Sequence, residues 1–226
     1  MYSVKPKAVL FDWDNTLADT WDIIHAALCV TFDEMGHEPW SFEDVKSGRE
    51  GIHHSLRDSF PRIFGDDWEK ARDIYYSAFL DTHLDKIKLM PMAEKVINLL
   101  HKSDILIGVV SNKTGKYLRE EVKHLGFDHC FSTIIGATDA KKDKPHPDPV
   151  HLALEGSNVK AGSDVWFIGD SETDLECALN SGCLPLYFGD NNLHEKYHID
   201  ERIKHPLRTI KNHDELLKIL ENFDLT

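Results

Sequence analysis

The chain has 226 residues, which allows one domain with an insertion, and its hydrophobic content of 41% is enough for a core. Its 39 acidic residues outnumber its 26 basic residues, and the formal charge of −13 argues against nucleic acid or an anionic membrane as partner, because both would repel the chain. No apolar run approaches the ~20 residues of a membrane-spanning helix.

The first predicted element is a buried strand, because residues 8–11 form an uninterrupted apolar run. The run ends in Asp12 and Asp14, with the turn-forming residues Asn15 and Thr16 beyond them. Open α/β sheets place their active sites at the carboxyl ends of strands, and two carboxylates there can hold a hard cation or divide nucleophilic and acid–base roles. Taken alone, the pair is explained equally well as an acidic turn that caps a helix.

A block of helices follows this first motif. Apolar residues recur at spacings of three and four over residues 21–35 and again over residues 68–78, which predicts two helices. Between them, Ser41 and Asp44 resemble a capping box, and we expect the helix that it opens to continue through Leu56. The block contains no strand pattern.

From residue 91 onward, apolar strands alternate with helices. We expect strands over residues 106–110, 133–135, 165–168 and 184–188. We expect helices over residues 93–100 and 116–125, a further helix that begins at Asp148-Pro149, and another that ends before Gly182. A short strand at Ile210 and an amphipathic helix over 216–220 close the chain, whereas the polar segment 190–207 has no clear period. The alternation predicts an α/β fold with a doubly wound parallel sheet.

The helical block interrupts this α/β pattern after its first strand. We therefore expect a catalytic core formed by residues 1–18 and 88–226, and an inserted helical domain formed by residues 19–87. The alternative is that the helices serve only as a dimerisation bundle.

Three further polar segments accompany the later strands. Ser111-Asn112-Lys113 follows the strand 106–110, Lys144 opens a loop rich in proline, and residues 169–174 (Gly-Asp-Ser-Glu-Thr-Asp) follow the strand 165–168. Each has an ordinary explanation, namely a helix cap, a solvated lysine and an acidic first turn of a helix. Together and in this order, the four motifs are hard to obtain by chance.

In these motifs the sequence resembles the haloacid dehalogenase superfamily, and within it the phosphoglycolate-phosphatase-like branch. The family motif Asp-x-Asp-x-Thr-Leu matches residues 12–17, a strand ending in Ser or Thr matches Ser111, Lys before Pro matches Lys144, and Gly-Asp-x-x-x-Asp matches residues 169–174. Asn15 stands where many relatives carry glycine, and asparagine also tolerates a left-handed backbone. The resemblance implies a Rossmann-like core with the helical insertion as a cap over the strand ends.

The resemblance also implies a reaction, the Mg²⁺-dependent hydrolysis of a small phosphate monoester through an aspartyl-phosphate, with phosphoglycolate as the first candidate substrate. Asp12 would be the nucleophile, and Asp14 the general acid and then the general base. The ligands of Mg²⁺ would be the Asp12 carboxylate, the Asp14 backbone carbonyl and Asp170, while Asp174 would orient a water ligand from the second shell.

Other residues would bind the phosphoryl group of the substrate. We expect Ser111 and Lys144 to contact the phosphoryl oxygens, together with backbone N–H groups that include that of Asn112. Lys144 would also keep Asp12 ionised. Arg49 lies where related caps present a substrate loop and could clamp a second anionic group such as a carboxylate. A solvated arginine at a helix end is an equally good interpretation.

Other functions stay open on the sequence. A phosphomutase of the same superfamily would carry the same four motifs. A non-enzymatic receiver-like phospho-switch also combines carboxylates, a hydroxyl and a lysine, but receivers lack a helical insertion after the first strand. A dehalogenase would use the Asp12 nucleophile without a metal or an acid, so Asp14 and Asp170 argue against it.

Cysteine and histidine usage bears on location and on metals. Cys29, Cys130, Cys177 and Cys183 show no metal-type spacing, and with no secretory leader in residues 1–7 we expect reduced thiols and a cytoplasmic protein. None of the 14 histidines has a spacing typical of a zinc site. We expect a small phosphorylated metabolite as the partner, and neither nucleic acid nor a membrane.

Overall fold

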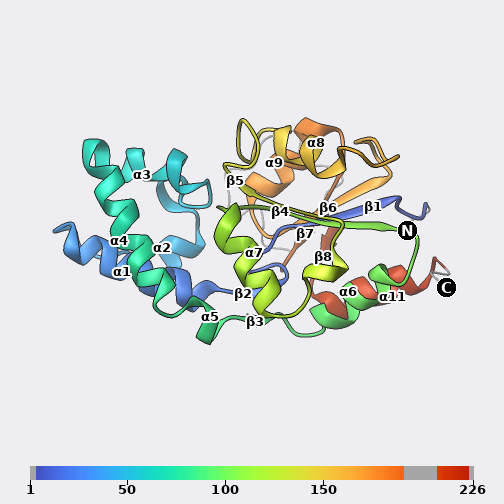
Figure 1. The fold of residues 1–226 in the computed structure, drawn as a ribbon, viewed down its shortest axis with the longest axis horizontal. Coiled ribbons are helices and arrows are strands. Elements are labelled where there is room, and N and C mark those ends of the chain that lie inside the picture. The colour runs from blue at the N-terminus through green and yellow to red at the C-terminus, as the bar shows by residue number, and fades with distance from the viewer. Residues whose placement is uncertain (1–3, 191–207, 224–226) are drawn as a thin grey trace.

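The computed structural model describes residues 4–190 and 208–223 (Figure 1), so most of the polar segment 190–207 lies outside the described residues. One six-stranded sheet runs in the order β5-β4-β1-β6-β7-β8, and neighbouring strands pair in parallel throughout. The strands are β1 (Ala8–Phe11), β4 (Leu106–Thr114), β5 (Thr133–Ala137), β6 (Val165–Gly169), β7 (Leu184–Phe188) and β8 (Arg208–Ile210). The predicted α/β fold with a parallel sheet is confirmed.

Helices cover both faces of this sheet (Figure 1). One face carries α8 (Asp148–Leu154) and α9 (Glu172–Ser181), and the other carries α6 (Ala93–His101), α7 (Gly115–His124) and α11 (His213–Glu221). Along β1, alternate side chains point to opposite faces, so Ala8 and Leu10 join one apolar cluster while Val9 and Phe11 join the other. Both faces of the strand are buried, which explains its uninterrupted apolar sequence.

Residues 20–87 form a second, mainly helical part (Figure 1). Its elements are α1 (Trp21–Glu34), α2 (Phe42–Lys46), η1 (Arg49–Gly51), α3 (Leu56–Phe64), η2 (Gly65–Asp67), α4 (Trp68–Leu80) and α5 (His83–Lys86). The two connections to the core run side by side, because β2 (Ala18–Asp19) pairs antiparallel with β3 (Lys88–Leu89). The division into domains at residues 18/19 and 87/88 stays a prediction. Among the described helices, none combines the length and the apolar character that crossing a bilayer requires.

One helix of this part differs from the prediction. The capping box at its start is present, but the helix ends at Lys46 and does not continue through Leu56. The φ angles of Gly48, Glu50 and Gly51 are +77°, +49° and +72°. An α-helix cannot continue through a left-handed backbone, so the chain turns and a new helix, α3, begins at Leu56.

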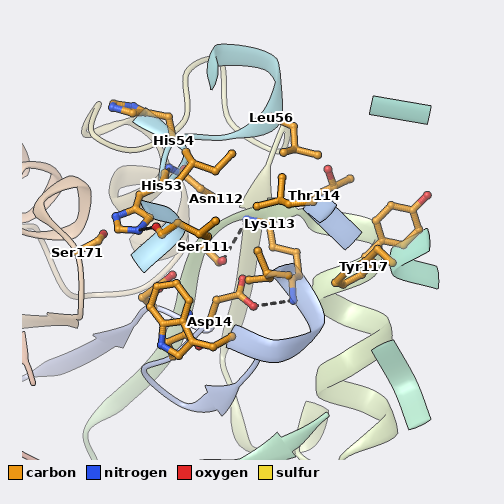
Figure 2. Close-up of a pocket in the computed structure, with 18 of the residues that line it drawn as sticks. Asp14, His53, His54, Leu56, Ser111, Asn112, Lys113, Thr114, Tyr117 and Ser171 are labelled. Atoms are coloured by element: carbon orange, nitrogen blue, oxygen red, sulfur yellow. Dashed lines mark hydrogen bonds and ion pairs between the residues drawn. The ribbon is translucent and has the colours of Figure 1, made fainter. Parts of the chain in front are cut away.

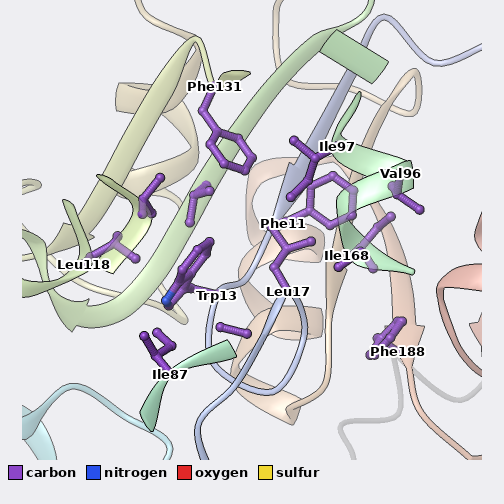
Figure 3. Close-up of a cluster of buried hydrophobic side chains, with 14 of the residues drawn as sticks. Phe11, Trp13, Leu17, Ile87, Val96, Ile97, Leu118, Phe131, Ile168 and Phe188 are labelled. Carbon is purple, nitrogen blue, oxygen red and sulfur yellow. The ribbon is translucent and has the colours of Figure 1, made fainter. Parts of the chain in front are cut away.

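The loop after β1 is anchored from two directions. Trp13 and Leu17 are fully buried and belong to the same apolar cluster as Ile87, which lies just before β3 (Figure 3). From the other end of the chain, Nε2 of His213 in α11 lies 2.8 Å from the carbonyl oxygen of Thr16. The loop that carries the first motif is thus held in place by residues distant from it in the sequence.

Candidate active site

Three adjacent strands end at one edge of the sheet, and each brings a polar side chain there. Asp12 follows β1, Ser111 lies in the later part of β4, and Asp170 follows β6, while β1 pairs with the other two strands. These three residues line one cavity together with Asp14, Asn112 and Lys144. The structure therefore brings the sequence-predicted core residues together at the carboxyl edge of the sheet, where open α/β sheets bind their ligands.

Lys144 joins two carboxylates at the base of this cavity. Its Nζ donates to Oδ1 of Asp12 at 2.7 Å and to Oδ1 of Asp174 at 2.6 Å, and all three side chains are buried. Two side-chain amides hold the loop that carries Lys144. The amide of Asn112 donates to the carbonyl oxygen of Lys144 at 3.1 Å, and the amide of Asn180 donates to the carbonyl oxygen of Pro145 at 2.8 Å. Burial alone would lower the pKa of Lys144, but the charges of Asp12 and Asp174 raise it above its ordinary value, so the residue is a permanent cation.

Asp12 is a buried carboxylate in a crowded electrostatic environment. Burial, assisted by the charge of Asp174, raises the pKa of Asp12 to about 7, and the positive charge of Lys144 opposes this shift. A further cation in the cavity would favour the ionised, nucleophilic form.

The carboxylates form a candidate cation site. One oxygen each of Asp12, Asp170 and Asp174 lie within 4.8 Å of one another, and an all-oxygen set suits a hard cation such as Mg²⁺. Both oxygens of Asp174 already have partners, since Oδ1 accepts from Lys144, and Oδ2 accepts from the Ser171 N–H (3.0 Å) and hydroxyl (2.6 Å). Asp174 is therefore better suited to orient the site than to bind the ion directly.

Asp14 is fixed by two donors to the same oxygen. The hydroxyl of Thr20 and the Nζ of Lys113 each donate to Oδ1 at 2.7 Å; Figure 2 shows the contact with Lys113. Within residues 4–190 and 208–223, no hydrogen-bond donor contacts Oδ2 of Asp14. That oxygen is the one available to a group bound in the cavity.

A buried network lies behind Asp14, and the sequence analysis assigns no role to its members. Lys113 Nζ also donates to Oε2 of Glu121 at 2.6 Å, and the same oxygen accepts from Trp13 Nε1 at 2.8 Å. Nδ1 of His83 lies 3.0 Å from Oε1 of Glu121. Burial works to raise the pKa of Glu121, but Lys113 and the other donors outweigh it and lower that pKa. The network therefore stabilises a charged glutamate inside the protein.

The helical part covers the cavity and contacts the core around its rim. The side-chain amide of Asn112 donates to the His53 carbonyl oxygen at 3.2 Å, and the hydroxyls of Tyr76 and Thr114 form a hydrogen bond. Arg57 of α3 forms an ion pair of 2.6 Å with Asp143 of the core. Figure 2 shows His53, His54 and Leu56 from the helical part lying above the polar residues of the core.

Arg49 does not line this cavity. Its guanidinium group lies 3.2 Å from a carboxylate oxygen of Asp44 and 5.0 Å from the centre of the Trp40 ring, and half of the side chain is exposed. The structure thus does not bring Arg49 together with the other predicted site residues, and its contact with substrate stays a prediction.

The fold and these motifs correspond to one known family. The sequence matches the haloacid dehalogenase-like hydrolases over residues 9–186, and the chain belongs to this family. A phosphoglycolate phosphatase from Neisseria meningitidis is 31% identical over 187 residues, which cover 80% of this chain and 79% of that protein. The pyrophosphatase PpaX from Listeria monocytogenes is 29% identical over 181 residues, covering 80% of this chain and 82% of that protein.

Solved structures of the family share the whole architecture. A haloacid dehalogenase-like hydrolase from Bacteroides fragilis superposes with a TM-score of 0.79 at 25% identity, covering 94% of this chain and 100% of that chain. A hydrolase of the superfamily from Ehrlichia chaffeensis is 29% identical, with a TM-score of 0.66, and covers 97% of this chain and 98% of that chain. The Rossmann-like core with a cap is therefore the fold of this chain.

Proposed function

We propose that the chain is a Mg²⁺-dependent phosphatase that hydrolyses a small phosphate monoester through an aspartyl-phosphate on Asp12. The observation that carries this proposal is the placement of Asp12, which lies in a covered cavity with Lys144 on one oxygen and with Asp14 two residues away. Family membership and the phosphatase names of the relatives support it.

Asp12 and Asp170 would hold the cation through their carboxylates, with Asp174 orienting the site. When bound, Mg²⁺ supplies positive charge that neutralises the phosphoryl group and favours its approach to a carboxylate. The Asp14 backbone carbonyl as a further ligand stays a prediction.

The residues present can carry out both halves of the reaction. A carboxylate oxygen of Asp12 attacks phosphorus, the bond from phosphorus to the ester oxygen breaks, and Asp14 donates its proton to the departing alkoxide. Asp14 then takes a proton from a water molecule. That water attacks the phosphorus of the aspartyl-phosphate, which releases inorganic phosphate and restores Asp12.

Ser111 and Lys144 neutralise and orient the phosphoryl group in both steps. The Ser111 hydroxyl accepts from the N–H of Lys113 at 3.1 Å, which leaves its own hydrogen free to donate to a phosphoryl oxygen. Lys144, which pairs with both Asp12 and Asp174 in this structure, provides the fixed positive charge.

Turnover of p-nitrophenyl phosphate tests the proposal and separates it from the alternatives. We expect release of inorganic phosphate in Mg²⁺, loss of that release in EDTA, and loss in Asp12→Asn. A receiver-like switch would become phosphorylated without turning over, and a phosphomutase would pass the phosphoryl group to a sugar in preference to water. The identity of the natural ester and a cytoplasmic location stay predictions.

A further inference from the structure

The cavity above the carboxylates is lined in part by aromatic side chains. Five of them surround the space that the ester group of a bound phosphate would enter: Trp21, Tyr75, Tyr76, Phe79 and Tyr117. Tyr76 and Tyr117 pack with ring centres 4.9 Å apart, and aliphatic residues such as Ile52 and Leu56 complete the wall. Such a wall favours a flat apolar group, because aromatic faces and edges pack well against another ring.

Positive charge is scarce in the same wall. Of the lining residues that the structure describes, only Lys113 and Lys144 are lysine or arginine, and each is held between two carboxylates. His54 also lines the cavity, and burial, together with the charge of Arg62, lowers its pKa, which favours the neutral form. A second anionic group on the substrate would therefore lie against an apolar wall without a counter-charge, which is costly.

The cap arginines Arg49, Arg57 and Arg62 do not line the cavity, and two of them form ion pairs outside it. Arg49 pairs with Asp44, and Arg57 pairs with Asp143.

The volume of the cavity also limits the size of the substrate. The cavity measures about 130 Å³, and this volume includes the end beside Asp12 and Lys144 where the phosphoryl group would bind, so a group as large as a nucleoside does not fit.

We propose, on the basis of the phosphatase function above, that the preferred substrates are phosphate esters of uncharged alcohols that carry one aromatic ring. The phosphoryl group contacts Asp12, Ser111 and Lys144, and the ring lies between Tyr117 and the cap aromatics. Carboxylated esters such as phosphoglycolate are poor substrates, although several relatives of this chain are named for that compound.

The direct test compares benzyl phosphate with its 4-carboxylated analogue in saturating Mg²⁺. The two esters break the same kind of P–O bond and have the same ring, so the added carboxylate is the main difference. We expect kcat/KM for benzyl phosphate to exceed that for the carboxylated ester and that for phosphoglycolate by about tenfold or more. Equal values, or a preference for either carboxylated ester, overturn the inference.

Two variants test the wall itself. Tyr117→Ala should lower the ratio of kcat/KM for benzyl phosphate over methyl phosphate by about tenfold. Trp68→Ala, which changes a cap aromatic that does not line the cavity, should leave this ratio unchanged.

Leu56→Arg adds the missing positive charge to the wall and should raise the ratio of kcat/KM for phosphoglycolate over methyl phosphate several-fold. Because the readouts are ratios, partial loss of folded protein does not change them. An unchanged ratio in both Tyr117→Ala and Leu56→Arg overturns the inference.

Failure of this inference differs from failure of the proposed function. If p-nitrophenyl phosphate is hydrolysed and Asp12→Asn abolishes that reaction, but phosphoglycolate is preferred, only the substrate class is wrong. If the wild type hydrolyses no ester, the proposed function and this inference both fall.

Discussion

Lys113 donates a hydrogen bond of 2.7 Å to Asp14 and one of 2.6 Å to Glu121, so a single buried ammonium group connects the proposed acid–base residue to the interior of α7. The lysine side chain is 8% exposed and that of the glutamate is fully buried. Asp14 therefore has a fixed position before any substrate binds. Such preorganisation is valuable, because an acid that is misplaced by 1 Å can lose about 100-fold in rate.

We expect Lys113→Met to be both slow and unstable. The substitution frees Asp14 and leaves the charge of Glu121 buried without its cation, which costs about 3–5 kcal/mol of unfolding free energy. Urea unfolding and kcat on p-nitrophenyl phosphate are the measurements. In the double variant Lys113→Met/Glu121→Gln the unpaired charge is gone, so stability should largely return while kcat stays low. A single variant with the stability and kcat of wild type would show that the network has neither role.

Asp14→Asn should depend on the leaving group. An amide cannot protonate an alkoxide, so hydrolysis of alkyl phosphates should become very slow. With p-nitrophenyl phosphate, whose leaving group needs no proton, the loss in kcat/KM should be smaller, because kcat/KM reports the first step even when the aspartyl-phosphate breaks down slowly. Steady-state kinetics on both esters decide the matter, and an equal loss on both would rule out Asp14 as the acid.

Asp170→Asn should have a higher melting temperature than wild type in EDTA and little activity. Three carboxylates lie close together around a single lysine, so removing one charge should raise the melting temperature in EDTA. Wild type should gain roughly 2.7 kcal/mol at a Mg²⁺ concentration of 100 times Kd, and the variant should gain less and have little activity. Melting curves of both proteins in EDTA and in Mg²⁺ provide the test. A variant that melts lower in EDTA and keeps the full Mg²⁺ shift would identify Asp170 as a helix-capping residue.

His213 should make the fold sensitive to mild acid. Burial lowers its pKa to about 4, whereas the unfolded chain has the ordinary value of 6.5, so its contribution to stability is complete above pH 6.5 and is lost as the pH falls toward 4. Between pH 7 and pH 5 the loss is about 2 kcal/mol of unfolding free energy. Urea unfolding at both pH values should show a smaller decrease in His213→Gln than in wild type. His124→Gln, which changes an exposed histidine, serves as the control and should behave as wild type. The same decrease in all three proteins would mean that other groups cause it.

The strands and the polar residues at their ends were predictable from the sequence because both are local signals. The apolar run 8–11 and the carboxylates after it need only chain neighbours to be recognised, and the parallel sheet then determines that Asp12, Ser111 and Asp170 meet. The break at Gly48 was missed because the capping box, although correct, defines only where a helix begins.

The network around Glu121 depends on contacts between distant elements, so its partners could not be read from spacing. His83 lies 38 residues from Glu121 and reaches it only when α5 packs on α7. One signal was available, since Glu121 falls on the same face of its helix as the buried Leu118 and Val122, where a carboxylate needs a buried partner. The position of Arg49 likewise follows from the turn at Gly48, which directs it to Asp44 and Trp40.

The most direct test of the account is chemical trapping of the aspartyl-phosphate. Asp14→Asn, which lacks the base for the second step, should accumulate the phosphorylated enzyme when it is mixed with p-nitrophenyl phosphate and Mg²⁺ and quenched with acid. Borohydride converts an aspartyl-phosphate to homoserine, and peptide mass spectrometry locates the change. The account predicts homoserine at position 12 and none in the Asp12→Asn/Asp14→Asn double variant. Turnover of the wild-type enzyme with no modified residue at position 12 in the trapped variant, or modification at another carboxylate, would contradict it.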